Sequence, residues 1–269
     1  VTPRPLIAQA NAGLPILQDG ETIFPGTPEE MTAYHERLIA LGVRVVGGCC
    51  GTTPSHIRAM REALGNFSHA WTPPARRGYL SSRSAVAEFG GEASCALIGE
   101  RINPTGKKGY TEELRTGKTA YVRREATAQV AAGAHLLDVN CGAPGVDEAA
   151  ALEKSVYAAS SACTAPLVID TSDPVALERA LKAADGKVLI NSVSGEVKSL
   201  ARILPLARRY GAAVIGLTLD EAGIPETAEG RVAIARRILD AVLAIGLPQQ
   251  DLVIDCLTLT VSAEQKRAL

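Results

Sequence analysis

The sequence predicts an α/β chain built from (β/α)8-barrel modules, and three observations lead to this prediction. Short apolar runs recur from residue 95 onward, amphipathic helical patterns separate them, and almost every run ends in a carboxylate or an amide. Apolar residues in continuous rather than alternating order indicate strands buried on both faces of a parallel sheet. The runs cover residues 96–103, 135–140, 166–170, 187–191, 212–220 and 251–255.

The polar endings favour a barrel over a doubly wound sheet. In a barrel all strand C-termini converge on one mouth where substrates bind, whereas a doubly wound sheet needs such endings only at its switch point. Six βα units are two short of closure. We therefore expect a barrel with six of its eight units present, in a chain that is incomplete at both ends. A helix that opens at Ser262, with capping-box spacing to Gln265, agrees with this expectation.

Composition argues against several classes of partner. The 269-residue chain has a formal net charge of −1 and lacks a long basic run, which argues against nucleic acid and membrane surfaces. Apolar stretches such as 212–219 are of strand length, far short of a membrane span. The six cysteines lie in a chain long enough to build a normal core, so we expect free thiols in a reducing cytoplasm rather than disulfides.

Changes in pattern divide the chain into three segments. Residues 1–65 read as helix, strand and helix, which is too little to bury a core alone, so we expect the C-terminal part of a larger barrel. Residues 66–94 lack a helical or strand period and are interpreted as an interdomain linker. Residues 95–269 contain the six apolar runs and form the truncated second barrel.

Local signals place the elements of the first segment. Thr27-Pro-Glu-Glu30 has capping-box spacing and opens a helix that continues to Leu41. Gly42 ends this helix, and residues 43–46 form a short buried strand. Thr53-Pro54 then opens the second helix.

Two adjacent cysteines follow the predicted strand, in Gly47-Gly-Cys-Cys-Gly-Thr-Thr-Pro54. On a regular strand Cys49 and Cys50 would point to opposite faces, but the flanking glycines permit a turn in which both sulfur atoms face one point. Two thiolates supply half of a tetrahedral zinc site. Spacing alone leaves this interpretation level with the alternative, a pair of buried thiols in a βα turn.

Carboxylates and amides cluster at the ends of the second segment's strands. One carboxylate can accept hydrogen bonds from both N3–H and the 2-amino group of a 2-amino-4-oxo pterin, while an amide meets the mixed edge that remains. A phosphate-binding barrel would instead offer glycine-rich loops and a late lysine or arginine. Helix capping explains any single residue equally well, but the whole set favours a site lining. The set is Glu100, Asn103, Asp138, Asn140, Asp170, Asn191 and Asp255.

The first segment resembles a known family. GGCCGTTPSHI is similar to the zinc signature of the homocysteine S-methyltransferase module of methionine synthases and betaine–homocysteine methyltransferases, and Asn11–Pro15 matches the segment that precedes it in methionine synthases. The resemblance implies that Cys49 and Cys50 are two of three zinc ligands. The third is found earlier in the family, outside this chain, and the homocysteine thiol takes the fourth position.

The second segment resembles the pterin-binding methyltransferase domain in the order and spacing of its motifs. This domain is shared with corrinoid iron–sulfur protein methyltransferases and, more distantly, with dihydropteroate synthase. The resemblance implies that Asp170, Asn191 and Asp255 hold the pterin ring, while Glu100, Asn103, Asp138 and Asn140 line the pocket. A further asparagine of the family lies on a seventh strand, beyond this sequence. The motifs are GERINPTGKKG (99–109), DVNCG (138–142), VIDTSDP (168–174), LINSVSGE (189–196) and VIDCLTL (253–259).

Together the two resemblances imply a fragment of a cobalamin-dependent methionine synthase. Such an enzyme transfers a methyl group from 5-methyltetrahydrofolate, through cobalamin, to zinc-bound homocysteine, and gives methionine and tetrahydrofolate. The cobalamin would be bound by a module absent from this chain, no catalytic residue is assigned, and the fragment alone is expected to be inactive. The alternatives are a corrinoid-protein methyltransferase or dihydropteroate synthase-like enzyme, against which GGCCGTTP argues, and a non-catalytic folate-binding fragment.

Overall fold

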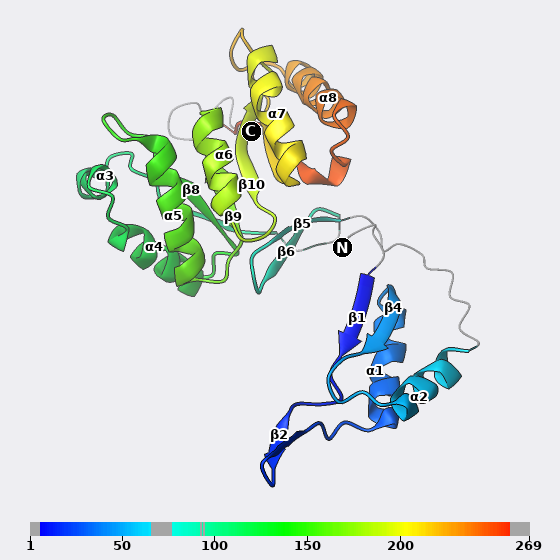
Figure 1. Cartoon of the computed structure of the whole chain (residues 1–269). Coiled ribbons are helices and arrows are strands. Elements are labelled where there is room, and N and C mark those ends of the chain that lie inside the picture. The colour runs from blue at the N-terminus through cyan, green and yellow to red at the C-terminus, as the bar shows by residue number, and fades with distance from the viewer. Residues whose placement is uncertain (1–5, 66–76, 92, 94, 259–269) are drawn as a thin grey trace. The chain divides into compact units, whose positions relative to one another are not determined.

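The computed structural model describes residues 6–65, 77–91, 93 and 95–258. The chain forms two compact units, residues 1–76 and residues 77–269, which are described separately (Figure 1). The helix expected from Ser262 lies outside the described residues. Among the helices of the described part, none has the length and apolar character needed to cross a membrane.

The first unit contains the predicted helix, strand and helix together with three strands that we did not predict. The strand expected to be buried over residues 43–46 is present, but only Val43 of these residues is buried. Thr27 Oγ1 accepts from the Glu30 N–H at 3.2 Å and Glu30 Oε2 accepts from the Thr27 N–H at 3.0 Å, so the predicted capping box is confirmed. The strands β1 and β4 pair in parallel, and β2 and β3 form a hairpin. The elements are β1 (Leu6–Ala10), β2 (Ile16–Gln18), β3 (Glu21–Ile23), α1 (Pro28–Ala40), β4 (Val43–Gly48) and α2 (Pro54–Leu64).

The second unit is built on a parallel sheet of six strands, and each predicted apolar run supplies one of them. The strand order in space follows the order in sequence without a reversal, whereas a doubly wound sheet would reverse at its switch point. In the described residues β7 and β12 are the outer strands. The strands are β7 (Ile98–Ile102), β8 (Leu136–Asn140), β9 (Leu167–Asp170), β10 (Leu189–Ser194), β11 (Ala213–Leu217) and β12 (Leu252–Asp255).

The two faces of this sheet have different neighbours. On one face the helices cover the strands, and Leu137, Ile169 and Ile190 join the main core (Figure 1). On the other face the alternate residues Leu136 and Val168 belong to a second, smaller apolar cluster. The helices are α3 (Lys108–Arg115), α4 (Ala120–Ala131), α5 (Glu148–Ala162), α6 (Pro174–Ala183), α7 (Val197–Tyr210) and α8 (Ala228–Ala244), with a 3-10 turn at Gln249–Asp251.

This alternation decides where the predicted site residues point. Successive side chains of a strand face opposite sides of a sheet. Asp138 and Asn140 therefore share the face of Leu136, while Asp170 shares the face of Val168. The apolar cluster fills the N-terminal half of this face, and the polar residues occupy its C-terminal end.

An antiparallel hairpin of β5 (Gly78–Ser81) and β6 (Val86–Phe89) covers the N-terminal end of the sheet. Ser81 donates its N–H to the Lys187 carbonyl at 2.9 Å, and Leu80 is fully buried in the second cluster. The expectation of a linker without regular structure over 66–94 was wrong for this hairpin. Its four-residue strands are too short to show a period in the sequence, and residues 66–76 lie outside the described part.

Candidate functional site

Four polar side chains from β8, β9 and β10 interlock at the C-terminal end of the sheet. Asn140 lies in register with Asp170, and Asp170 with Asn191. Asn140 Nδ2 donates to Asp170 Oδ2 at 2.8 Å, and Asn191 Nδ2 donates to Asp138 Oδ2 at 3.0 Å. Each carboxylate is therefore paired with an amide from a different strand, so the pairs hold one another in place before any ligand arrives.

Burial and mutual repulsion alter the acidity of this group. Burial raises the pKa of Asp138 to about 7, the Asn191 hydrogen bond opposes this rise, and the charges of Asp170 and Glu100 add to it. Burial likewise raises the pKa of Asp170, against the bond from Asn140 and with a contribution from Glu100. Glu100 from β7 thus belongs to the same electrostatic cluster, which favours ligands that bring hydrogen-bond donors.

The cluster offers several hydrogen-bond acceptors. Within the described residues, Asp170 Oδ1, Asn191 Oδ1 and the Glu100 carboxylate have no hydrogen-bond partner, whereas Asn140 Oδ1 already accepts from the Gly142 N–H at 2.9 Å. No group of three or more His, Cys, Asp or Glu side chains is arranged to hold a metal ion in the part of the chain that the structure describes. The arrangement suits an organic ligand with several N–H groups.

The other two predicted residues make local bonds instead. Asn103 Oδ1 accepts from the Thr105 N–H at 2.9 Å in the loop after β7. Asp255 ends β12, and its Oδ1 accepts from the Leu257 N–H at 2.7 Å while the residue stays exposed. The structure thus brings five of the seven predicted residues together, whereas Asn103 and Asp255 accept hydrogen bonds from the loops that follow their own strands.

The cysteine pair lies directly after β4, where the chain turns toward α2. The two exposed sulfur atoms are 3.9 Å apart, so they lie on the same side of the turn. Tetrahedral zinc with bonds of about 2.3 Å separates two thiolates by roughly 3.8 Å. The hydrogen bond with Cys49, and then the charge of that neighbour, raise the pKa of the Cys50 thiol. A cation between the sulfur atoms would offset this repulsion and favour both thiolates.

Residues that the sequence did not single out support this turn. Asn11, which follows β1, accepts the Cys50 N–H through its Oδ1 at 3.2 Å. His35 is buried in α1, and its Nε2 lies 3.0 Å from the Gly47 carbonyl oxygen. Gly51 has a φ of +77°, and a Cβ atom there would meet Phe24 Cβ at 2.2 Å. The similarity of residues 11–15 to the family segment was a signal for Asn11, and no sequence signal marked His35.

Thr171 is a further residue that sequence reasoning missed. It follows Asp170 directly, is 4% exposed, donates its hydroxyl to Glu148 Oε1 and accepts from the Asp173 N–H at 3.1 Å. These contacts join the end of β9 to the first turns of α5 and α6, and so fix the backbone beside Asp170. The VIDTSDP motif contains this threonine, but its spacing did not reveal the partner.

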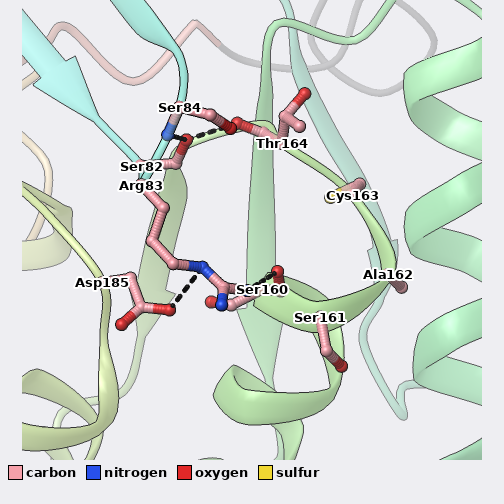
Figure 2. A pocket seen from close by; sticks show the side chains of 9 residues that line it. All are labelled: Ser82, Arg83, Ser84, Ser160, Ser161, Ala162, Cys163, Thr164 and Asp185. Carbon is pink, nitrogen blue, oxygen red and sulfur yellow. Dashed lines mark hydrogen bonds and ion pairs between the residues drawn. The ribbon is translucent and has the colours of Figure 1, made fainter. Parts of the chain in front are cut away.

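A polar cavity of about 300 Å³ lies at the N-terminal end of the strands, opposite the end that carries the Asp and Asn cluster (Figure 2). Figure 2 shows Arg83, from the turn of the β5–β6 hairpin, extending between Asp185 and Ser160. Arg83 Nε lies 3.1 Å from Asp185 Oδ2, and its guanidinium donates to the Ser160 carbonyl at 2.8 Å. The one cationic group of this cavity is therefore engaged by the protein, and the predicted site residues lie elsewhere.

Residues 99–269 match the pterin binding enzyme family, and residues 1–64 match the homocysteine S-methyltransferase family. The first match covers more than half of the chain, so the chain belongs to the pterin-binding enzymes. The homocysteine S-methyltransferase segment ahead of it makes the chain a member of the methionine synthase type, with the C-terminal end of one domain followed by the pterin-binding domain.

Two curated relatives align with this chain over almost its whole length. The chain is 32% identical over 271 residues to methionine synthase of Mycobacterium tuberculosis and 30% identical over 276 residues to that of Mycobacterium leprae. Each alignment covers 98% of this chain and 23% of the relative, so the chain spans about a quarter of the length of these proteins.

Similar solved structures include two dihydropteroate synthases. The enzyme of Vibrio fischeri has a TM-score of 0.48 at 20% identity, over 66% of this chain and 65% of that chain. The enzyme of Thermus thermophilus has a TM-score of 0.47 at 26% identity, over 66% of this chain and 64% of that chain.

Proposed function

We propose that this chain binds the two substrates of a methionine synthase, 5-methyltetrahydrofolate in the second unit and homocysteine in the first. The reaction transfers the methyl group of 5-methyltetrahydrofolate, by way of cobalamin, to homocysteine and gives methionine and tetrahydrofolate. The observation that carries the proposal is the interlocked cluster of Asp138, Asn140, Asp170 and Asn191 at the strand ends. The homocysteine S-methyltransferase match ahead of it supports the choice of acceptor.

The second unit would recognise the pterin through its donors. Asp170 Oδ1 accepts from the pair formed by N3–H and the 2-amino group, and Asn191 Oδ1 accepts from another ring N–H. Asp255 Oδ1 accepts from the Leu257 N–H, which leaves its other carboxylate oxygen for the pterin. Asp255 would reach the ring after a local change of conformation. Glu100, Asn103 and Asn140 complete the lining, and Asn140 does so by fixing Asp170.

The first unit would hold homocysteine through zinc. Cys49 and Cys50 fit two positions of a tetrahedral zinc ion by their sulfur separation of 3.9 Å. No third His, Cys, Asp or Glu accompanies them within the described residues. The resemblance to the homocysteine S-methyltransferase family implies a third cysteine earlier in such proteins. Zinc held there would lower the pKa of a bound thiol and would so present homocysteine as the thiolate, which is the nucleophile.

Cobalamin, when bound by the full-length protein, would supply the cobalt centre for methyl transfer, and this chain is proposed to present both substrates to it. An amine is a poor leaving group, so methyl transfer from the pterin N5 needs a hydrogen bond or a proton at that nitrogen. The ring donors held by Asp170 and Asn191 fix the orientation of N5 for this step.

Two substitutions in the full-length protein separate the two halves of the proposal. Cys50→Ser should abolish zinc and homocysteine binding while 5-methyltetrahydrofolate affinity stays unchanged. Asp255→Ala should weaken 5-methyltetrahydrofolate binding while zinc and homocysteine binding stay unchanged. Cys256→Ser is the matched control, because Cys256 is also exposed but follows β12 in the other unit. Zinc is quantified by elemental analysis and both ligands by calorimetric titration. Retention of zinc by Cys50→Ser contradicts the metal assignment, and unchanged folate affinity in Asp255→Ala contradicts the role of Asp255.

A further inference from the structure

Asp138 differs from the other members of the cluster in its surroundings. It is 1% exposed, and only its Oδ2 has a partner, the Nδ2 of Asn191 at 3.0 Å. Its Oδ1 is buried and makes no hydrogen bond within the described residues. A carboxyl group buried to this extent can act on a ligand through Asn191, its one hydrogen-bond partner among the described residues.

The bond to Asp138 determines which end of the Asn191 amide is presented to a ligand. An ionised carboxylate only accepts hydrogen bonds, so it holds Nδ2 and leaves the amide oxygen for a ligand N–H. A protonated carboxyl also donates. It can bond to the amide oxygen instead, and a half-turn of the amide then presents Nδ2 to the ligand. The two charge states therefore present opposite hydrogen-bonding groups at the same place.

We propose that Asp138 is a positioning residue that sets the orientation of the Asn191 amide through its own charge, so that the site accepts a pterin ring N–H only while Asp138 is ionised. This inference rests on the proposed pterin function and adds a proton-controlled selection of the ligand. The group that touches the pterin is Asn191, and Asp138 acts through it.

The charged groups around Asp138 keep it near the balance between its two states. Glu100 on β7 and Asp170 on β9 oppose its ionisation, and the neutral Asn191 on β10 favours it. Burial is the largest contribution, and together these effects raise the pKa of Asp138 to about 7. Small changes of pH near neutrality therefore change the population of the amide orientation that accepts an N–H.

The test is calorimetric titration of 5-methyltetrahydrofolate against the full-length wild type, Asp138→Asn and Asp138→Ala between pH 6 and pH 8. If only the ionised form binds, wild-type affinity should fall about tenfold from pH 8 to pH 6 for a group with a pKa near 7. An asparagine at 138 does not titrate, so its hydrogen bonding to Asn191 does not change with pH, and the affinity of Asp138→Asn relative to wild type should rise about tenfold from pH 8 to pH 6. The ligand is common to both proteins, and its own titration cancels in this ratio.

The alanine variant separates positioning from simple packing. Asp138→Ala removes the acceptor, so Asn191 is no longer oriented and the affinity should be low at both pH values, whereas Asp138→Asn restores it. A constant ratio of Asp138→Asn to wild type across pH, with binding intact, overturns the inference and leaves the pterin function standing. Absence of 5-methyltetrahydrofolate binding by the wild type at every pH contradicts the pterin function, and the inference with it.

Discussion

Asn140 and Asp170 face each other in register at the ends of β8 and β9, and the amide nitrogen of Asn140 donates to Asp170 Oδ2 at 2.8 Å. The amide oxygen of Asn140 accepts from the Gly142 N–H at 2.9 Å, so rotation of the amide would lose two hydrogen bonds. The remaining oxygen of Asp170 is thereby held in one direction. Such preorganisation lowers the ordering cost of ligand binding.

The turn that carries the cysteine pair depends on Gly51, and we predict that Gly51→Ala destabilises the first unit and weakens zinc binding. A side chain at its φ of +77° costs about 1–2 kcal/mol, and the clash with Phe24 adds to this cost. Gly20→Ala is the control, because Gly20 has a φ of +82° with open space around its missing Cβ. Chemical denaturation and zinc content should separate the two variants; equal effects would contradict the account of the turn.

A buried ion pair joins the segment before β10 to the 3-10 turn before β12, next to Tyr79 of the hairpin, and we predict a large loss of stability in Lys187→Ala. Lys187 Nζ lies 2.6 Å from Asp251 Oδ1 and 4.4 Å from the centre of the Tyr79 ring. The side chain of Lys187 is 15% exposed and that of Asp251 is 6% exposed. Removal of the lysine leaves a buried unpaired carboxylate, at a cost of about 3–5 kcal/mol.

The control for this prediction is Arg77→Ala, which breaks the exposed pair between Arg77 and Glu88. Those side chains are 50% and 55% exposed, so the change should cost about 0–1 kcal/mol. Urea denaturation measures both variants. A loss in Lys187→Ala as small as that in Arg77→Ala would show that the buried pair does not stabilise this end of the sheet.

Asp138 should also affect the dependence of stability on pH. Because the folded state raises its pKa to about 7, above the usual value of 3.8, the folded protein holds this proton more tightly than the unfolded chain does. Its contribution to stability is present below about pH 4 and is lost as the pH rises to about 7. Asp138→Asn should therefore gain stability relative to wild type over this interval, by up to roughly 4 kcal/mol. Denaturation at pH 4 and pH 8 measures the stability of Asp138→Asn relative to wild type. The same relative stability at both pH values would contradict a raised pKa of Asp138 in the folded protein.

The sequence predicted the six strands of the sheet because each is a continuous apolar run that ends in a polar residue. It also predicted five residues that the structure gathers into one cluster, since strand ends on one sheet necessarily lie together. It could not predict the β5–β6 hairpin, whose burial depends on contacts with distant residues such as Lys187. Nor could it predict that Asn103 and Asp255 bond to their own loops, because capping and ligand binding use the same side chains.

Asp170 is proposed to accept hydrogen bonds from the pterin ring, and calorimetric titration of 5-methyltetrahydrofolate against wild type and Asp170→Ala in the full-length protein tests this role most directly. Loss of a carboxylate that pairs with buried donors costs about 1–3 kcal/mol, so the affinity should fall roughly tenfold to a hundredfold. Asp185→Ala, at the opposite end of the strands, should leave the affinity unchanged. Equal affinity of the wild type and Asp170→Ala would contradict the pterin assignment.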